Sequence, residues 1–219
     1  PNNVFWLPDT HKDFPGAKII LLFRDGRDVS VDLVNVNLAS NIYTACILWK
    51  RYTQAMLKAK QLLPSDSYCE IFYENLIQEP IKEVKRICEF LDVEYSPNML
   101  KFYEREPKGY MKKNIYKETH KPITTEFVEI YKKLSMFDKR LQISVIGKTL
   151  DKLGYLYEET PRKVGFWERE RYLEEEQYGG LIFEGAIQYK ISHAEKRAQR
   201  KQRDIWNDRI QKGFQGRTY

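Results

Sequence analysis

The sequence predicts an α/β fold in which helices flank a parallel sheet, and three observations support this. Residues 18–23 form a short, continuous run of β-branched and leucine residues, which is typical of a buried parallel strand. Residues 68–73 are rich in aromatic residues and isoleucine and predict a second strand. Segments with helical periodicity lie between and after these runs, so the order strand–helix–helix–strand–helix indicates parallel strands joined by helical crossovers.

Length and composition allow a real hydrophobic core. A chain of 219 residues can bury about 70% of its surface on folding. The 42% of hydrophobic and 14% of aromatic residues exclude a wholly disordered chain. The net charge of +6 suits an anionic ligand, a nucleic acid or an acidic surface, without choosing among them.

The first strand leads directly into a helix. Pro15 and Gly16 precede the strand, and the charged run 24–28 ends it. Asp25 or Gly26 can begin the helix that follows, because both residue types favour helix starts. Residues 18–38 therefore predict a strand, a tight turn and a helix.

Two further helices surround the second strand. Residues 42–63 contain no glycine or proline, and Pro64 ends the segment. Pro80 suits the first position of a helix whose apolar stripe runs to Leu91.

The region from residue 104 onward is predicted as a loop followed by two helices. Residues 104–121 are polar and predict a surface loop. Pro122 is expected to start a helix with a stripe of Phe127, Ile130, Tyr131 and Leu134. Another helix is expected over residues 138–153, with Gly154 in the position that follows a helix end.

The chain changes character after residue 158. Residues 159–219 are dense in charge and are predicted to form a helical tail, with one long helix over 181–212. Basic residues between Lys190 and Arg203 could bind nucleic acid. Acidic residues interleave with them, which favours a solvated helix that packs on the domain or mediates association with itself or a partner. Nucleic-acid binding is the less favoured interpretation.

Cysteine and histidine usage predicts neither a disulfide framework nor a metal site. An odd number of cysteines among apolar neighbours indicates buried free thiols, with one disulfide as the alternative; these residues are Cys46, Cys69 and Cys88. The three histidines share no ligand spacing, so no metal is expected. The apolar runs are too short to predict a transmembrane segment.

Arg24 is the strongest candidate for a binding residue. It follows the first strand, at the edge where α/β folds bind ligands, and the helix that comes next directs free N–H groups at the same place. These features predict a phosphate contact. The alternative is an arginine that pairs with Asp25 or Asp28 to tie the turn.

These residues resemble a family. The run Lys18-Ile-Ile-Leu-Leu-Phe-Arg-Asp-Gly-Arg-Asp-Val29 is similar to the second nucleotide-binding motif of sulfotransferases that use 3′-phosphoadenosine 5′-phosphosulfate (PAPS). Residues 72–80 resemble the Tyr-Glu-Asp-Leu…Pro segment of that family, and residues 150–155 resemble its Leu-Gly-Tyr helix end. The resemblance is specific over residues 13–93 and looser to 155.

The resemblance implies a P-loop-type parallel sheet and transfer of a sulfuryl group from PAPS to a hydroxyl or amine. Arg24 matches the arginine that binds the 3′-phosphate. Tyr73 matches a tyrosine near the adenine, although a core aromatic at a strand end is the alternative. Asp32 stands where the family has a serine on the same phosphate, so its carboxylate would oppose the phosphate or pair with Arg24; Ser30 is a less favoured substitute for that serine.

Two family elements have no match in this sequence: the Gly-rich loop with its lysine and the catalytic base. Both precede the matched arginine in the family, so catalytic residues are expected upstream of Pro1. Residues 1–158 are accordingly predicted as the C-terminal part of an incomplete sulfotransferase-like domain, inactive alone. The resemblance implies a small-molecule or carbohydrate acceptor and no metal, and it leaves the compartment open. The alternative is a non-catalytic relative that acts through its basic tail as an interaction or polyanion-binding module.

Overall fold

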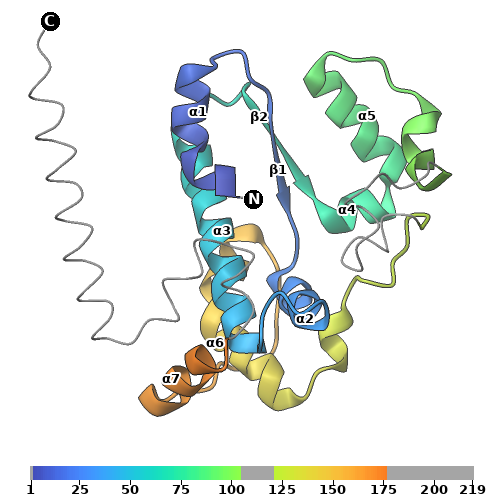
Figure 1. Ribbon diagram of the computed structural model, residues 1–219. Helices are drawn as coiled ribbons and strands as arrows, with labels where there is room; N and C mark the ends of the chain where they lie inside the picture. The colour runs from blue at the N-terminus through green and yellow to red at the C-terminus, as the bar shows by residue number, and fades with distance from the viewer. Residues whose placement is uncertain (1, 105–120, 177–219) are drawn as a thin grey trace, which may run out of the picture.

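A computed structural model describes residues 2–104 and 121–176 of the chain, and its centre is a two-stranded parallel sheet (Figure 1). Strand β1 spans Ile19–Phe23 and strand β2 spans Tyr68–Phe72. The strands pair in register from Ile19 opposite Tyr68 to Phe23 opposite Phe72. Both predicted strands and their parallel arrangement are confirmed.

The crossover between the strands is made of two helices, as predicted. Helix α2 spans Gly26–Asn35, and the side chain of Asp25 caps it by accepting a hydrogen bond from the Arg27 N–H. Helix α3 spans Ile42–Leu62, and the Asn41 side chain caps it by accepting from the N–H of Thr44. Such caps satisfy N–H groups that have no partner inside the helix.

The chain turns into helix earlier than predicted after β2. Tyr73 begins the short helix α4 (Tyr73–Gln78) instead of ending the strand, and α5 (Pro80–Leu91) follows with its proline at the first turn. Asp92 ends α5 in the left-handed conformation, with φ of 56°. Asp is among the few non-glycine residues that adopt this conformation at modest cost.

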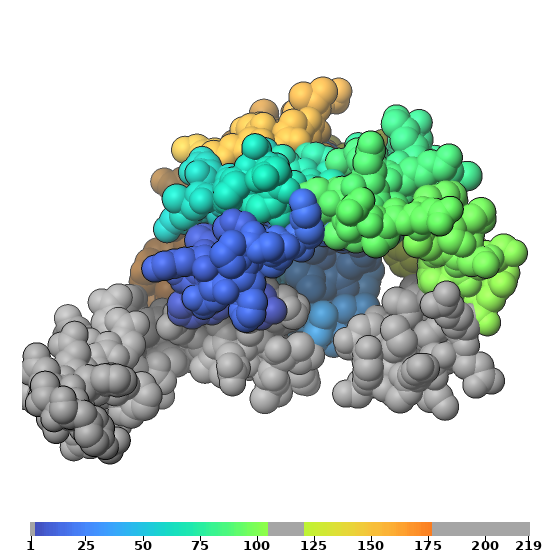
Figure 2. All heavy atoms as spheres, turned by 90° about the horizontal axis from the view of Figure 1, so that it is seen from above, coloured from blue at the N-terminus to red at the C-terminus, as the bar shows by residue number. Residues whose placement is uncertain are grey.

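The N-terminal residues pack on α3. The segment η1 (Asn2–Trp6) is a 3₁₀ helix, and α1 (Leu7–Asp13) follows it. The rings of Phe5 and Tyr52 lie 5.1 Å apart, and in Figure 2 the N-terminal segment lies directly against α3.

The predicted helix at residues 122–134 is wrong. The segment holds only the 3₁₀ helix η5 (Ile130–Lys133), preceded by Glu129 in the left-handed conformation with φ of 61°. Before it, the Phe127 carbonyl accepts from the Arg24 side chain and the Glu129 N–H donates to Asp28 of α2, and neither group bonds within a helix. The 3₁₀ segment η2 (Pro97–Glu104) occupies the start of the predicted surface loop, whose residues 105–120 lie outside the described ranges.

The helix predicted over 138–153 is confirmed as α6 (Met136–Leu153). The Ser135 hydroxyl caps its start, and Gly154, with φ of 79°, ends it in the left-handed conformation. One buried cluster joins α6 to α3, and it consists of Cys46, Trp49, Ile143, Ile146 and Leu150.

The described chain ends with α7 (Phe166–Glu174), which lies near the start of α3. There the side-chain amide of Asn41 donates to the backbone carbonyl of Tyr172 over 2.8 Å. The long helix predicted over 181–212 and the basic run within it lie outside the described residues. The division at residue 158 stays a prediction.

The side chains on the two faces of β1 differ in how far they are buried. Leu21 and Phe23 are 2% and 1% exposed, on the face where Lys60 of α3 forms an ion pair with Glu70. Ile20 and Leu22 point to the other face and are 43% and 49% exposed. Among the described residues β1 pairs with β2 alone, so its second edge is also open.

Three observations bear on the remaining sequence predictions. All three cysteines are buried free thiols, as expected. In the described part of the chain, no group of three or more histidine, cysteine or acidic side chains could hold a metal ion. No helix within those same residues has the length and apolar character needed to cross a membrane.

Candidate functional site

The candidate site is the α2 corner, which we define as residues 24–32 at the turn from β1 into α2. Trp49 of α3 fixes the turn, because its indole N–H donates to the Arg24 carbonyl over 3.1 Å. Gly26 lies against the same indole, and a Cβ at this position would come within 2.5–2.6 Å of the ring. The turn therefore needs glycine in order to pack on Trp49.

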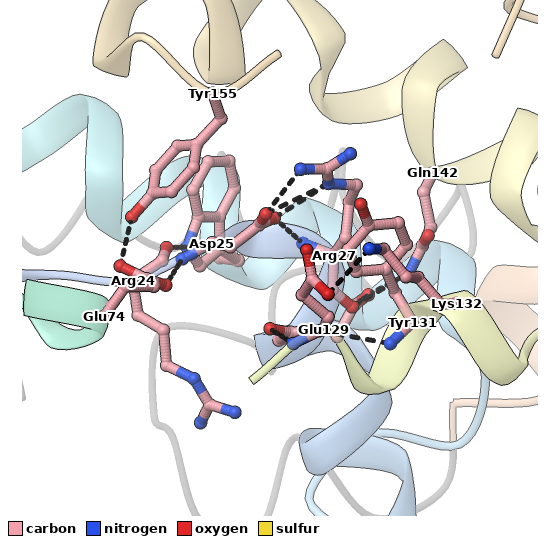
Figure 3. A network of polar contacts seen from close by, with 12 residues as sticks. Arg24, Asp25, Arg27, Glu74, Glu129, Tyr131, Lys132, Gln142 and Tyr155 are labelled. Atoms are coloured by element: carbon pink, nitrogen blue, oxygen red, sulfur yellow. Dashed lines mark hydrogen bonds and ion pairs between the residues drawn. The ribbon is translucent and has the colours of Figure 1, made fainter. Parts of the chain in front are cut away.

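The Arg24 side chain has three neighbours from different parts of the chain. Its Nη1 lies 2.6 Å from a carboxylate oxygen of Asp32, and its Nη2 donates to the Phe127 carbonyl over 2.8 Å. Its guanidinium carbon lies 4.5 Å from the ring centroid of Tyr73. The Nε atom is buried and has no hydrogen-bond partner among the described residues. Arg24 thus keeps an unused buried donor, and Figure 3 shows its guanidinium pointing away from the neighbouring polar cluster.

The structure brings all three predicted binding residues together, since Arg24 contacts both Asp32 and Tyr73. Asp32 pairs with Arg24, which is one of the two outcomes expected of a carboxylate at this position. Arg24 does not pair with Asp25 or Asp28, which was the alternative to a phosphate contact. Asp25 pairs with Arg27, and Asp28 accepts hydrogen bonds from backbone N–H groups. Whether the three residues bind a nucleotide stays a prediction.

Arg27 has a structural role at the corner. Its Nε donates to both carboxylate oxygens of Asp25, and its Nη2 lies 2.6 Å from one of them. Its guanidinium carbon lies 4.0 Å from the ring centroid of Tyr131. Both charged groups of the pair are buried, so Arg27 is not available to a ligand.

Asp28 is the most buried acid of the corner, with 2% of its surface exposed. Its two oxygens accept hydrogen bonds from the backbone N–H groups of Glu129, over 2.8 Å, and Tyr131, over 3.1 Å. Burial raises its pKa from 3.8 to about 6, while these two hydrogen bonds act in the opposite direction. Asp28 therefore ties α2 to a segment more than one hundred positions away in the sequence.

Glu74 ties the same turn to α4. It accepts the backbone N–H of Asp25 over 2.9 Å and the hydroxyl of Tyr155 over 2.8 Å. Burial and the neighbouring carboxylate raise the pKa of Tyr155, so its hydroxyl stays a neutral donor. Figure 3 shows these bonds meeting at the start of the turn.

Ser30 faces the interior and cannot replace the family serine at Arg24. Its hydroxyl donates to the Arg27 carbonyl over 2.9 Å and accepts from the Gln142 amide over 2.8 Å. The residue is fully buried. Ser30 therefore faces away from Arg24, in line with its place as the less favoured substitute.

Sequence reasoning missed the residues that brace the corner: Trp49, Glu74, Phe127, Asp28 and Gln142. Their partners lie far away along the chain, so no local spacing connects them. The one signal at hand was the acid-rich turn Asp25-Gly-Arg-Asp28, in which each acid needs a partner once buried.

Comparison with known proteins shows which family the chain resembles. Residues 1–97 match the model of the sulfotransferase family. A solved structure, "Sulfotransferase Domain from the Curacin Biosynthetic Pathway", superposes with a TM-score of 0.55 at 18% identity, over 72% of this chain and 62% of that domain. At this identity the likeness shows the α/β fold alone. Residues 1–97 are thus similar to the sulfotransferase family, as the motifs of this segment indicated.

Curated relatives are similar over part of their length. A Caenorhabditis briggsae protein, provisionally named a protein-tyrosine sulfotransferase, is 31% identical over 110 residues, or 48% of this chain and 39% of the relative. Protein-tyrosine sulfotransferase 1 of Danio rerio is 28% identical over 162 residues, or 66% of this chain and 43% of the relative. The chain thus spans about two fifths of the length of the curated relatives it matches.

Proposed function

We propose that the intact protein transfers a sulfuryl group from PAPS to a hydroxyl or amine acceptor, and that Arg24 binds the 3′-phosphate of the donor. The observation that carries this proposal is the unused, buried Nε donor of Arg24 at the end of β1. Parallel sheets bind ligands beyond the carboxyl ends of their strands, and the N-terminus of a helix favours anions. The similarity to the sulfotransferase family supplies the chemistry, because the transferred group in this family is a sulfuryl group.

The neighbours of Arg24 suit a nucleotide in part. An arginine can donate two hydrogen bonds to a phosphate at once, and the Tyr73 ring under the guanidinium offers an aromatic surface for the adenine. Asp32 opposes the phosphate, because two like charges 4 Å apart repel by about 4 kcal/mol per charge pair at an effective dielectric constant of about 20. We infer that Asp32 weakens the nucleotide site without removing it.

The rest of the catalytic machinery belongs, in this proposal, to polypeptide that precedes Pro1 in the intact protein. The sequence holds no Gly-rich loop with a lysine to receive the 5′-phosphosulfate. The open edge of β1 and the exposed side chains of Ile20 and Leu22 offer a place for a further strand and helix. Parallel sheets are normally covered on both faces.

The acceptor class to assay first is the tyrosine hydroxyl of a peptide, because the curated relatives carry the name of protein-tyrosine sulfotransferases. Small-molecule and carbohydrate hydroxyls form the second panel. The proposal expects radioactive sulfate transfer from PAPS by the intact gene product and no turnover by the 219-residue chain alone. Turnover by this chain would overturn the assignment of catalytic residues to another segment.

Nucleotide binding tests the role of Arg24 directly. The probe is adenosine 3′,5′-bisphosphate, measured by calorimetry at low salt. Arg24→Ala is expected to weaken binding about tenfold or more, since a charge-assisted hydrogen bond contributes roughly 1.5–3 kcal/mol. Arg86→Ala is the matched control, because Arg86 is a half-exposed arginine that pairs with Glu83 on α5. Equal affinity of the two variants would contradict the proposal.

The Arg24–Asp32 pair also favours a second candidate function, a sulfotransferase-fold protein without catalysis. In that case Asp32 neutralises Arg24 and the nucleotide does not bind. Asp32→Ser separates the two candidates. A donor site that Asp32 only weakens should bind adenosine 3′,5′-bisphosphate more tightly after this change, whereas a site that has lost its function should bind it neither before nor after.

A further inference from the structure

The segment that follows residue 126 reaches Arg24 through a single backbone carbonyl, that of Phe127. The same segment meets the first turn of α2 at two more points. The N–H groups of Glu129 and Tyr131 bond to Asp28, and the Tyr131 ring lies under the Arg27 guanidinium. We refer to residues 127–131 as the α2 strap.

We propose that Asp28 is a positioning residue of the nucleotide site, because it holds the α2 strap in place and the strap orients the guanidinium of Arg24. The inference rests on the proposed function of Arg24. It adds a role to Asp28, which does not contact Arg24 by a hydrogen bond or ion pair in the described structure.

The backbone of the strap is bent around Asp28. Glu129 has φ of 61°, a conformation that few residues other than glycine adopt. This turn directs two N–H groups, two residues apart, at the two oxygens of one carboxylate. The strained turn persists because Asp28 satisfies both groups, which is how such conformations are usually retained.

The position of the Phe127 carbonyl follows from this attachment. Phe127 lies two residues before Glu129, so the chain between the carbonyl and the first Asp28 bond is short. With the strap attached, Arg24 has a partner on each side, Asp32 at Nη1 and the carbonyl at Nη2, and the Tyr73 ring below. A guanidinium held in this way loses less freedom when it binds a phosphate, and preorganisation of this kind increases affinity.

Asp28 is a costly way to attach a loop, which indicates a role beyond folding. Its carboxylate is buried, and its partners are two neutral N–H groups, not a cation. Burial raises its pKa to about 6, so the ionised form is disfavoured in the fold. Protonation would leave a single acceptor oxygen for two N–H groups, and the strap would lose one attachment.

Asp28→Asn imitates that loss at every pH, because the amide offers one acceptor and one donor. We expect Asp28→Asn to bind adenosine 3′,5′-bisphosphate about tenfold more weakly than the wild type at pH 7.5, the value of about one hydrogen bond. The ratio of the two affinities should shrink toward one as the pH falls below about 6. Titration of the nucleotide phosphate affects both proteins and cancels in the ratio.

The other charged and titratable groups around Asp28 are the same in both proteins, so their effects cancel in the ratio; these groups are Arg24, Asp25, Arg27, Glu129, Tyr131 and Tyr155. The matched control is Ser30→Ala, which removes buried hydrogen bonds on the other side of α2 and leaves the strap untouched. It should destabilise the protein without changing the pH profile of binding.

A second measurement follows Arg24 itself and needs no ligand. The buried Nε–H of Arg24 should give a sharp, slowly exchanging NMR signal in the wild type and in Ser30→Ala. The signal should broaden or disappear in Asp28→Asn, and in the wild type below about pH 6. An unchanged signal in folded Asp28→Asn overturns the inference, as does nucleotide affinity equal to or higher than that of the wild type. If the wild type itself does not bind the nucleotide, the proposed function fails, and the NMR signal alone decides the role of Asp28.

Discussion

Two neighbouring regions of this protein differ in how completely their side chains are buried and bonded: the α2 corner and the face of β1 that carries Ile20 and Leu22. At the corner, side chains from α3, α4 and α6 bond to backbone groups of the turn and of α2, and backbone N–H groups of the α2 strap bond to the buried Asp28 carboxylate. In β1, which leads directly into the corner, the two aliphatic side chains of Ile20 and Leu22 are about half exposed. The difference separates what the described residues complete by themselves from what they leave open.

The contrast fits the function proposed here. The corner would bind the 3′-phosphate of the donor, so its geometry has to be set before the ligand arrives. The open face and edge of β1 would receive the polypeptide that holds the reacting end of the donor. Each of the following experiments tests whether the two regions differ in this way.

The largest effect is expected from truncating side chains on the two faces of β1. Phe23→Ala should reduce the free energy of unfolding by about 3–5 kcal/mol, because the ring is almost fully buried. Leu22→Ala, on the open face, should reduce it by about 1 kcal/mol or less. Urea denaturation measures both. Equal losses would mean that the Leu22 face is covered in solution.

The second effect is a dependence of stability on pH that comes from Asp28. Its pKa in the fold, about 6, is above the usual value of 3.8, so the folded state holds the proton more strongly between these values. Stability from this group therefore falls as the pH rises through this window. Relative to Asp28→Asn, the wild type should lose about 2 kcal/mol between pH 4 and pH 7, since one pKa unit corresponds to about 1.4 kcal/mol and the unfolded-state carboxyl is already partly ionised at pH 4. A flat difference would show that the carboxylate is not buried in solution.

Packing at the corner predicts a third effect. Gly26→Ala would place a Cβ within 2.5–2.6 Å of the Trp49 ring, and the bulky indole has to move. A loss of about 1–3 kcal/mol in the free energy of unfolding is expected, as for other overpacked sites. Gly16→Ala is the control, because a Cβ there meets nothing within 4 Å. Thermal unfolding should separate the variants, and equal midpoints would contradict the close packing of the corner.

The smallest effect concerns the Tyr155–Glu74 bond. Tyr155→Phe removes a hydroxyl that donates to Glu74 over 2.8 Å, at a cost of about 1 kcal/mol. Tyr157→Phe removes an exposed hydroxyl that donates to Asp151 over 3.2 Å and should have no measurable effect. Chemical denaturation of the two variants tests whether Glu74 braces the turn. An unchanged free energy of unfolding in Tyr155→Phe would count against that role.

Much of the fold was predictable because local rules decide it. The strands at 18–23 and 68–73, the helices that begin near residues 26, 42, 80 and 138, and the helix end at Gly154 follow from apolar runs, caps and breakers. The helix expected over 122–134 failed for a non-local reason. Its stripe of apolar residues is compatible with a helix, but Asp28 binds the N–H groups of Glu129 and Tyr131 and bends the backbone instead.

Some residues of the candidate site were likewise predictable from the sequence and others were not. The motif at residues 18–29 identified Arg24, Asp32 and Tyr73, and these side chains do meet. The motif gave no information on Phe127 or Glu74, whose contacts with the corner span 103 and 49 positions.

By itself, the amino-acid sequence determined the resemblance to sulfotransferases, the order of the elements and the arginine that follows β1, because motifs, caps and periodicity act over a few residues. Only the tertiary structure decided which acid pairs with Arg24, which acid holds the α2 strap and which face of β1 is left open. Three aspartates lie within eight positions of Arg24, and local spacing cannot rank them. Burial and the arrival of distant backbone N–H groups decide among them, since a buried charge is stable only where partners from elsewhere in the fold reach it.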